Sequence, residues 1–389
     1  MPAKVLHVIP SLDPLAGGPV SAVEGMTTAL AQAGAAVEVL TTFRGGEDTA
    51  IIDRLKERGI RVTRIGPVRT PIGHHPQLKA ATQEAISRND LVHIHALWEN
   101  VQHYSARAAQ QLNKPYIITT HGMLDPWSLK QSPIRKKIYL AWRLRHNLDH
   151  ATALHFTADA ERASVQLPIK AATMVEPLGL DLSDFDPLPA PGKFRQQWAI
   201  PDTTKLLTFL GRIHPGKGVE YLVPALAKIK DTNAKLAIVG PDSENYQQTI
   251  MSQVESLGIK DRVIFTGPLS GQEKLGALLD ADIFCLPSDH ENFGIVVIEA
   301  LACAVPVLIS DQVKIYREIE QAQVGQICQT NVESVVSNLD TMLQADLPET
   351  YPPKKLRSFV HDHYDWSVIA NKVLAHYQRL LPTSTTRSL

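Results

Sequence analysis

One stretch of the chain, residues 288–306, reads SDHENFGIVVIEALACAVP and predicts a polar loop followed by a helix. An apolar segment with the length of a buried strand, residues 282–286, comes just before it. A second apolar segment, residues 307–310, comes just after it. Strands joined through a helix run parallel in one sheet, so this stretch predicts an α/β fold.

The junction between the loop and the helix is a candidate anion site. The first N–H groups of a helix have no partner within the helix, and the helix dipole adds partial positive charge there. A phosphate group is therefore expected to bind near the residues at this junction, which are Phe293, Gly294, Ile295 and Val296.

Two glutamates, Glu291 and Glu299, flank the junction and lie eight positions apart. At ~1.5 Å per residue this spacing spans roughly 12 Å, more than the ~5 to 9.5 Å between the carboxyl groups of glycosidase pairs. The two acids are therefore not expected to act on one bond. A nucleotide sugar, with hydroxyls at both ends and a diphosphate between them, suits the pattern. The alternative is a solvated loop acid and an unrelated helix-surface acid.

Length and composition set the broad class. A chain of 389 residues exceeds the size of a single core, which predicts two domains. Lys and Arg (39) balance Asp and Glu (40), so no overall charge favours nucleic acid as a partner. The three cysteines, at positions 285, 303 and 328, are expected to be core thiols in a reducing compartment. No apolar run resembles a signal peptide or a membrane span, which predicts a cytoplasmic protein.

The first half alternates between predicted strands and helices, which indicates a parallel sheet covered on both faces. The predicted strands are residues 5–9, 37–41, 62–65, 91–95, 116–120, 151–156 and 173–176. Gly17 and Gly18 precede the first helix, where they would let a ligand approach the backbone closely. An ordinary turn at a helix start is the alternative.

Histidines follow two of these strands, at the sheet edge where ligands bind in such folds. His95 precedes Trp98 and Glu99, and His121 stands next to a glycine. His121 is a candidate donor to a sugar hydroxyl or to a developing charge. His93 and His95 share one strand face, but no third ligand is evident at a compatible spacing, so no metal is assigned.

The second half begins after residues 177–192, a segment rich in proline and glycine that is typical of a linker. A predicted strand, residues 206–210, is followed by a basic glycine-rich turn at residues 211–218 and a helix. Glycines at 216 and 218 would free the backbone, while Arg212 and Lys217 would supply positive charge to a diphosphate. Further strands are predicted at residues 235–239, 263–266, 282–286 and 307–310. Backbone groups near Gly240 and Leu269 are candidates for holding a nucleotide base.

Two Asp-x-Asp sequences, at residues 184–186 and 280–282, match a pattern of metal-dependent nucleotide-sugar enzymes. The first lies in the linker and the second crosses from a helix end into a strand, so neither is assigned a metal. A segment that begins at Ile134 and ends at His146 predicts an amphipathic helix with a dense basic face. Such a helix is typical of proteins that bind anionic membranes, and an ordinary surface helix is the alternative.

The Gly17-Gly18 loop, the pairs Gly211-Arg212 and Lys217-Gly218, and the motifs Glu291-Asn292-Phe293-Gly294 and Glu299-Ala300 occur in this order over nearly the whole chain. As a set they resemble glycosyltransferase family 4. The segment from His121 to Trp127 is similar to those of bacterial exopolysaccharide transferases. The resemblance implies a GT-B fold, in which two Rossmann-like doubly wound domains face a central cleft. We expect residues 1–185 with helix 366–389 to form the acceptor domain, and residues 186–365 the donor domain.

The resemblance also implies a chemistry: retaining transfer of a hexose from a nucleotide diphosphate sugar, with no metal or other cofactor. Arg212 and Lys217 would stabilise the diphosphate, with help from the amides of Gly18, Ile295 and Val296. Gly17 is a further candidate for donor binding. Glu299 would hold the ribose. Glu291, with the amides of Phe293 and Gly294, would hold the donor sugar, and His121 would contact it near the reacting carbon.

The implied partners are a nucleotide-sugar donor and an oligosaccharide or lipid-linked acceptor at the inner face of the plasma membrane. His95, Trp98 and Glu99 are candidate acceptor contacts. UDP-glucose is the favoured donor. GDP-mannose stays the alternative, because these motifs do not identify the base or the sugar. A nucleotide-sugar-binding subunit with little activity of its own is an alternative of another class.

Overall fold

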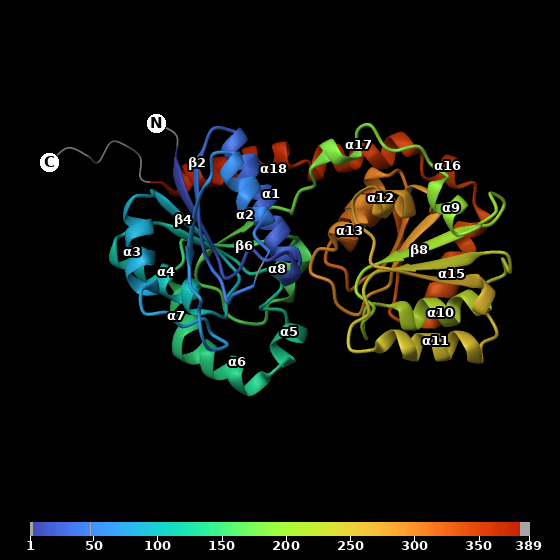
Figure 1. Ribbon diagram of the computed structural model, residues 1–389, viewed down its shortest axis with the longest axis horizontal. Coiled ribbons are helices and arrows are strands. Elements are labelled where there is room, and N and C mark those ends of the chain that lie inside the picture. The colour runs from blue at the N-terminus through green and yellow to red at the C-terminus, as the bar shows by residue number, and fades with distance from the viewer. Residues whose placement is uncertain (1–2, 47, 382–389) are drawn as a thin grey trace. The chain divides into compact units, whose positions relative to one another are not determined.

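The computed structural model describes residues 3–46 and 48–381 and divides the chain into two units. Unit 1 comprises Met1–Gly179 and the chain from Trp366 onward, and unit 2 comprises Leu180–Asp365. Each unit is built on its own parallel sheet, as the ribbon drawing shows (Figure 1). The alternation of strands and helices therefore gives two doubly wound α/β units, as the sequence predicts.

Among the described residues of unit 1, seven strands lie in the order β3-β2-β1-β4-β5-β6-β7. They are β1 (Lys4–Ile9), β2 (Ala36–Thr42), β3 (Arg61–Ile65), β4 (Leu91–His95), β5 (Tyr116–Thr119), β6 (Ala153–Phe156) and β7 (Ala172–Val175). Chain order reverses between β1 and β4, and ligands bind beyond the strand ends at such a switch point. The register pairs His7 with His93, His95 with Thr119, and Thr119 with His155, which brings polar side chains together on one sheet face.

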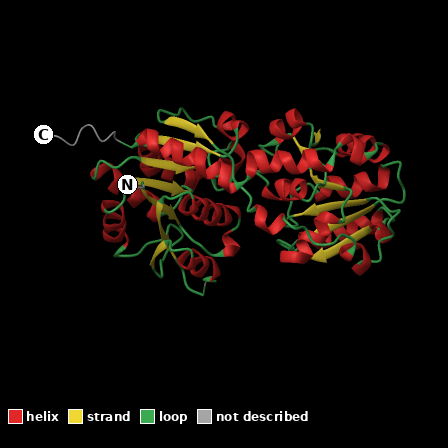
Figure 2. Cartoon of the chain, turned by 90° about the horizontal axis from the view of Figure 1, so that it is seen from above, coloured by secondary structure: helices red, strands yellow, loops and turns green. Residues whose placement is uncertain are grey.

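Helices cover both faces of this sheet (Figure 2). They are α1 (Gly18–Gln32), α2 (Ala50–Glu57), α3 (Leu78–Ser87), α4 (Asn100–Gln111), α5 (Pro126–Lys130), α6 (Pro133–Tyr139), α7 (Arg145–Asp149), α8 (Asp159–Ser164) and α18 (Trp366–Leu380). The helix predicted for residues 134–146 is present as one continuous helical segment, which consists of α6, a π-helical turn at Leu140–Leu144, and α7. No described helix has both the length and the apolar run that crossing a membrane requires.

Helix α18 returns to unit 1 and packs against α1. The indole of Trp366 lies on two glycines, because a Cβ at Gly25 would be 2.1 Å from Trp366 Nε1 and one at Gly179 would be 2.5 Å from Trp366 Cδ2. Tyr377, near the other end of α18, is fully buried. The part of the expected helix beyond residue 381 lies outside the described residues.

The six strands of unit 2 lie in the order β10-β9-β8-β11-β12-β13. They are β8 (Leu206–Leu210), β9 (Lys235–Val239), β10 (Val263–Gly267), β11 (Ile283–Leu286), β12 (Val307–Ser310) and β13 (Gly325–Cys328). The sequence does not predict β13, a short edge strand in which a Cβ at Gly325 would lie 2.2 Å from the Val307 carbonyl oxygen. All three cysteines are buried and free, as expected of core thiols.

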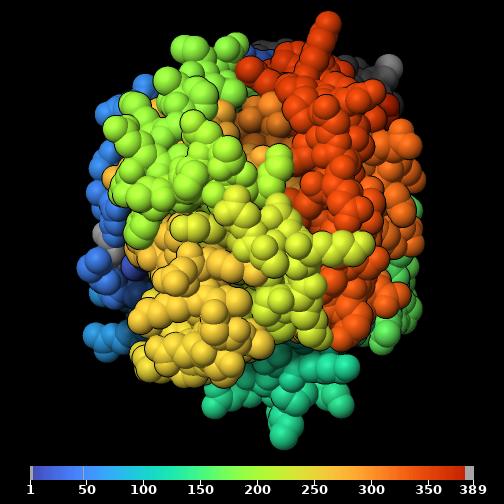
Figure 3. All heavy atoms as spheres, turned by 90° about the vertical axis from the view of Figure 1, so that its right-hand side faces the viewer, coloured from blue at the N-terminus to red at the C-terminus, as the bar shows by residue number. Residues whose placement is uncertain are grey.

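The helices of unit 2 are α9 (Lys193–Gln197), α10 (Val219–Lys228), α11 (Tyr246–Ser256), α12 (Gly271–Leu279), α13 (Ile295–Ala302), α14 (Tyr316–Ala322), α15 (Val332–Gln344), α16 (Leu347–Thr350) and α17 (Pro353–Tyr364). Its first residues, light green in Figure 3, lie beside its last helices in red. One link between these segments runs from the Arg357 guanidinium to the Phe185 carbonyl at 3.3 Å.

The chain passes from unit 1 to unit 2 after Gly179, within the segment of residues 177–192 that is rich in proline and glycine. The Leu180 N–H donates to the Tyr364 carbonyl at 2.7 Å, and the Phe185 side chain is buried. The proline-rich segment from Leu180 onward is therefore part of unit 2 rather than a free linker, because it pairs with the chain as it leaves that unit.

Candidate functional site

In unit 2 the chain order reverses between the neighbouring strands β8 and β11. The basic glycine turn follows β8, and the loop of Glu291 follows β11. Two hydrogen bonds join these loops: the Asp289 backbone N–H and the Ser288 side-chain hydroxyl each donate to the Gly216 carbonyl at 2.9 Å. Because both loops leave the carboxyl edge of the sheet at its switch point, they form one candidate site.

Lys217 and Glu291, one from each loop, form an ion pair with 2.6 Å between Nζ and Oε2. Their side chains are 22% and 24% exposed, so the pair is partly screened by water. The structure thus brings together the cation expected to meet a diphosphate and the acid expected to meet a sugar. Arg212 is exposed, and no hydrogen bond or ion pair engages it within the described part of the chain.

The backbone of the glycine turn is not free, contrary to the prediction from Gly216 and Gly218. The Glu220 carboxylate accepts from the Gly216 N–H at 2.6 Å and from the Gly218 N–H at 3.1 Å. The Lys217 N–H donates to the His214 carbonyl at 3.1 Å. The turn can therefore attract an anion through the charge of its side chains, but these backbone amides are not available to it. Gly218 serves packing instead, since a Cβ there would lie 2.5 Å from the Pro287 carbonyl oxygen.

The start of α13 does offer free amides. Gly294 precedes the helix with φ of 74° and ψ of 60°, a left-handed conformation that suits glycine. Among the described residues, the N–H groups of Phe293, Gly294, Ile295 and Val296 have no acceptor, while that of Val297 donates to the Gly294 carbonyl. Phe293 is buried and its ring packs edge-on against Tyr364. The buried Phe293 ring thereby holds the loop in place, and the successive N–H groups of the loop are available to an anion.

Glu299 is a buried residue of α13, not a helix-surface acid. Its Oε1 atom lies 2.8 Å from the Lys274 ammonium of α12, and its Oε2 atom is buried with no hydrogen-bond partner among the described residues. A buried carboxylate oxygen without a donor is costly, and a ligand hydroxyl would satisfy it. The sequence does not single out Lys274, which becomes recognisable only once α12 and α13 are seen to pack together.

Gly240 and Leu269 follow β9 and β10 on the same sheet. A Cβ at Gly240 would lie 1.9 Å from the Gly211 carbonyl oxygen, so only glycine fits there. Leu269 is half-buried. Their proposed contact with a base stays a prediction.

The second Asp-x-Asp sequence has structural partners. Asp280 accepts from the N–H groups of Gly192 and Arg195, and Asp282 pairs with the Arg195 guanidinium at 2.8 Å and the Lys205 ammonium at 3.2 Å. These carboxylates hold α9 and the base of β8 to the sheet.

In unit 1 the candidate His121 follows β5 in a left-handed conformation with φ of 47°. Such a conformation is uncommon for a residue with a side chain. The carboxylate of Glu161, fully buried in α8, holds the residues on either side: Oε1 accepts from the Thr120 hydroxyl at 2.6 Å and from the Gly122 N–H at 2.7 Å. Oε2 accepts from the N–H and hydroxyl of Thr157 at 2.6 and 2.8 Å. No motif near Glu161 in the chain marks it as a functional residue, so it is recognisable only in the structure.

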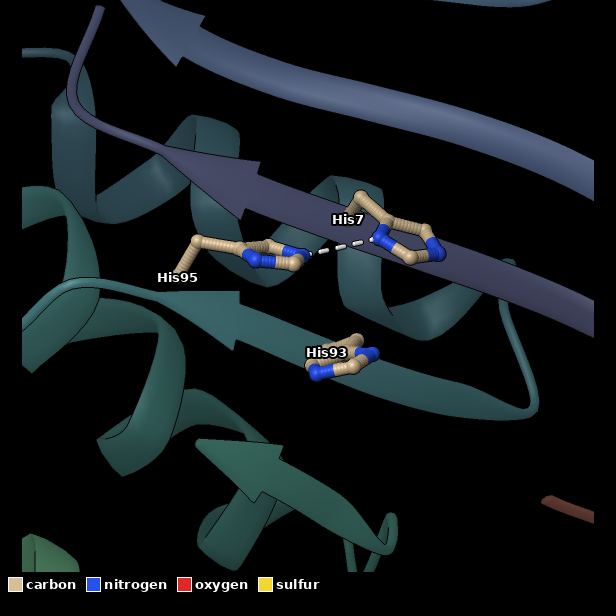
Figure 4. Close-up of side chains that lie close together, drawn as sticks. All are labelled: His7, His93 and His95. Atoms are coloured by element: carbon tan, nitrogen blue, oxygen red, sulfur yellow. Dashed lines mark hydrogen bonds between the residues drawn. The ribbon is translucent and has the colours of Figure 1, made fainter. Parts of the chain in front are cut away.

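The ring of His121 begins a chain of three imidazoles. Its Nε2 lies 3.2 Å from His95 Nδ1, and His95 Nε2 lies 3.0 Å from His7 Nδ1. Figure 4 shows His7 on β1 and His93 and His95 on β4, with the bond between His7 and His95 dashed. Burial lowers the pKa of both His7 and His121 to about 3, with the nearby His155 adding to the shift, and it also lowers that of His95. All three rings are therefore neutral near pH 7.

A second chain crosses the same sheet face. Tyr377 OH lies 2.6 Å from His93 Nδ1, His93 Nε2 lies 2.6 Å from Thr119 Oγ1, and Thr119 Oγ1 lies 2.9 Å from His155 Nδ1. The chain ends at the Glu176 carbonyl, 2.8 Å from His155 Nε2. A row of bonded polar groups thus replaces an apolar core beneath α18.

Ring nitrogens of His7, His93 and His95 lie within 4.8 Å of one another, so the sheet supplies the third histidine that the sequence did not reveal. The two nitrogens of His93 and the two of His95 already have hydrogen-bond partners, as does His7 Nδ1. A metal ion would have to break several of these bonds. The observed geometry therefore favours a hydrogen-bonded network.

The remaining candidates of unit 1 have varied surroundings. Gly17 and Gly18 are exposed at the start of α1, and a Cβ at either would meet no atom within 4 Å, so the structure gives no packing reason for glycine there. Glu99 caps α4 through a capping box with Gln102 and pairs with Arg44 at 3.1 Å. Trp98 packs edge-on against the ring of Tyr139. Their roles in acceptor binding stay predictions.

Two family models match the chain, one within each unit. Residues 192–357 match the model described as glycosyl transferases group 1, and residues 17–175 match the glycosyl transferase 4-like domain. The chain belongs to the glycosyltransferase family that these two models together describe. The resemblance to glycosyltransferase family 4 is thereby confirmed.

Individual relatives of this glycosyltransferase agree with the assignment. It is 29% identical to a D-inositol 3-phosphate glycosyltransferase of Arthrobacter sp. over 352 residues, which cover 82% of this chain and 80% of that protein. It is 31% identical to the uncharacterized glycosyltransferase MJ1607 of Methanocaldococcus jannaschii, but over 188 residues, 48% of this chain and 47% of that protein. The crystal structure of Anabaena Alr3699/HepE in complex with UDP and glucose is similar with a TM-score of 0.75 and 19% identity, covering 97% of this chain and 100% of that one. This likeness shows the GT-B fold.

Proposed function

We propose that this glycosyltransferase moves a hexose, with retention of configuration, from a nucleotide diphosphate sugar to a lipid-linked oligosaccharide. The observation that carries the proposal is the run of four unpartnered amides from Phe293 to Val296, next to the paired Lys217 and Glu291. Successive N–H donors at a helix start, with a lysine beside them, match the charge and hydrogen-bonding needs of a diphosphate.

The proposed roles follow from these surroundings. Lys217 and the exposed Arg212 stabilise the departing diphosphate, and the Glu299 Oε2 atom accepts from a ribose hydroxyl. The bond between the reacting sugar carbon and the diphosphate breaks as an acceptor hydroxyl oxygen bonds to the same face. The hydroxyl proton passes to the departing diphosphate. This sequence needs neither a protein nucleophile nor a metal ion.

UDP-glucose is the donor we favour, and GDP-mannose is the alternative. Thermal-shift measurements over matched UDP- and GDP-sugars separate them, because a ligand that binds only the folded protein raises its melting temperature according to its affinity. Release of nucleotide diphosphate, with and without acceptor, then tests catalysis. Binding without turnover across lipid-linked and free acceptors would instead indicate a nucleotide-sugar-binding subunit.

We further propose that unit 1 contacts an anionic membrane at the cytoplasmic face through residues 134–146. Ile134, Ile138 and Trp142 are 73%, 62% and 73% exposed and recur every four positions. Arg135 and Lys137 lie between them and are themselves exposed. An apolar row flanked by cations is the pattern of interfacial helices.

Sedimentation with vesicles of phosphatidylglycerol or of phosphatidylcholine tests this contact. The triple variant Ile134→Ser, Ile138→Ser, Trp142→Ser should lose binding to the anionic vesicles. Leu257→Ser, which changes an exposed apolar residue of unit 2, is the matched control and should bind as before. Equal binding by the triple variant and the control would refute the membrane contact.

A further inference from the structure

The two hydrogen-bonded chains on the sheet of unit 1 differ in one respect: only one of them has a fixed direction. A backbone carbonyl can only accept, so His155 Nε2, which lies 2.8 Å from the Glu176 carbonyl oxygen, must carry a hydrogen. The neutral His155 then accepts at Nδ1 from the Thr119 hydroxyl. Thr119 in turn accepts from His93 Nε2, and His93 Nδ1 accepts from the Tyr377 hydroxyl.

The chain of His121, His95 and His7 ends in imidazoles on both sides, so two directions satisfy its two internal bonds. In one direction His121 donates through Nε2 and the last hydrogen lies on His7 Nε2. In the other direction His7 donates through Nδ1, His95 donates through Nδ1, and the hydrogen of His121 lies on Nδ1. The three rings switch together, because each internal bond needs one donor and one acceptor.

The surroundings of His7 select between these directions. Its Nε2 atom is buried and has no hydrogen-bond partner among the described residues. The first direction would leave an N–H there without an acceptor, and orphaned buried N–H groups are rare in proteins. The second direction leaves only a bare ring nitrogen.

We propose that His7, acting through His95, is a positioning residue that keeps the hydrogen of His121 on Nδ1. Among the described residues the Nδ1 atom of His121 has no partner, and it is not one of the fully buried unpaired atoms. An outward N–H donor at the end of β5 is thereby available to an oxygen atom of a bound sugar. The role of this donor in transfer rests on the proposed function, whereas its presence does not.

The tautomer can be measured without any substrate. Two-bond proton–nitrogen spectra of the full chain labelled with ¹⁵N-histidine distinguish a protonated ring nitrogen from a bare one, and loss of signals in His121→Gln assigns the ring. We expect the hydrogen on Nδ1 of His121 in the wild type. A hydrogen on Nε2 would overturn the proposal.

Three variants test the influence of His7. His7→Leu removes the end of the chain and should give His121 a mixture of both tautomers, while His7→Asn keeps a side-chain amide near the Nδ1 position and should restore the Nδ1 form. Tyr377→Phe is the matched control, since it removes a buried bond on the same sheet face but belongs to the other chain. An unchanged His121 spectrum in folded His7→Leu, or an equal change in Tyr377→Phe, would overturn the proposal.

Kinetics provide an independent measurement. His7→Leu should lower kcat about tenfold or more while the donor KM stays within about twofold, since the lost donor acts near the reacting carbon. His7→Asn should recover most of kcat. If the wild type releases no nucleotide diphosphate, the proposed function fails, but the spectra still decide whether His7 controls the tautomer.

Discussion

Lys217 Nζ lies 2.6 Å from Glu291 Oε2, although the two residues are 74 positions apart. Each comes from a loop at the switch point of the unit 2 sheet, and each is a predicted donor-site residue. Without a ligand, the lysine and the acid satisfy each other. A diphosphate would compete with Glu291 for the same ammonium, so donor binding is expected to change this ion pair.

Replacing Lys217 by Met should reduce kcat/KM for the donor by roughly 10- to 100-fold. This range corresponds to loss of one hydrogen bond to a charged group, about 1.5–3 kcal/mol. Stability should change by less than about 1 kcal/mol, because the ion pair is partly exposed. Lys228→Met, which breaks an exposed pair with Glu333, is the control for activity. Steady-state kinetics and urea unfolding measure both effects, and near-wild-type turnover would contradict the assignment.

Lys274 and Glu299 should respond differently to substitution. Lys274→Met leaves a largely buried carboxylate without its cation and should cost about 2–3 kcal/mol of unfolding free energy. Glu299→Gln keeps an acceptor for Lys274, so it should cost less stability but raise the donor KM about tenfold through its weaker bond to ribose. Denaturant unfolding and donor titration check the contrast. A donor KM unchanged in Glu299→Gln would remove the ribose role.

Glu161→Gln should weaken the loop that carries His121. The carboxylate accepts four hydrogen bonds. In glutamine one of its oxygens is replaced by an NH₂ group, which would face N–H or O–H groups that are themselves donors. We expect a loss of about 2–3 kcal/mol in stability together with a lower kcat. Glu84→Gln, at an exposed ion pair with Arg88, should be close to wild type in both measurements.

Gly240→Ala should cost about 2–4 kcal/mol, because its Cβ would overlap the Gly211 carbonyl oxygen, a backbone atom that cannot rotate away. Gly276→Ala in α12 is the matched control. The nearest atom to its Cβ would be 4.0 Å away, so the substitution should stabilise the helix by up to about 1 kcal/mol. Thermal unfolding of the two variants should therefore move in opposite directions.

Acid should destabilise the protein below pH 6.5. Burial lowers the pKa of His155 to about 4 and those of His7 and His121 to about 3. Between pH 6.5 and 4 the unfolded chain takes up protons that the folded protein does not, so the free energy of unfolding falls as pH falls. Above pH 7 these histidines are neutral in both the folded and the unfolded chain, so their contribution to the free energy of unfolding does not change with pH. Urea titrations across this range should show a smaller slope for His7→Leu than for wild type.

Local patterns predicted most of the strands and helices, because their apolar periodicity and glycine stops depend on neighbours in the chain. They missed β13, which is held at the sheet edge by the close approach of Gly325 to Val307. They also misjudged the amides of Gly216 and Gly218, whose partner is the side chain of Glu220. The contacts of Lys274 with Glu299 and of Glu161 with the His121 loop depend on packing between elements rather than on spacing along the chain. Neither Lys274 nor Glu161 could therefore be identified from the sequence.

The sequence by itself determined the two α/β units, the family, and the residues at the ends of β8 and β11, since strand ends and helix starts are local features. Tertiary structure decided what these residues meet. It paired Lys217 with Glu291 and Glu299 with Lys274, and it placed His7 beside His93 by strand register. Contacts of this kind arise when strands from distant parts of the chain become neighbours, and no spacing along the sequence encodes that order.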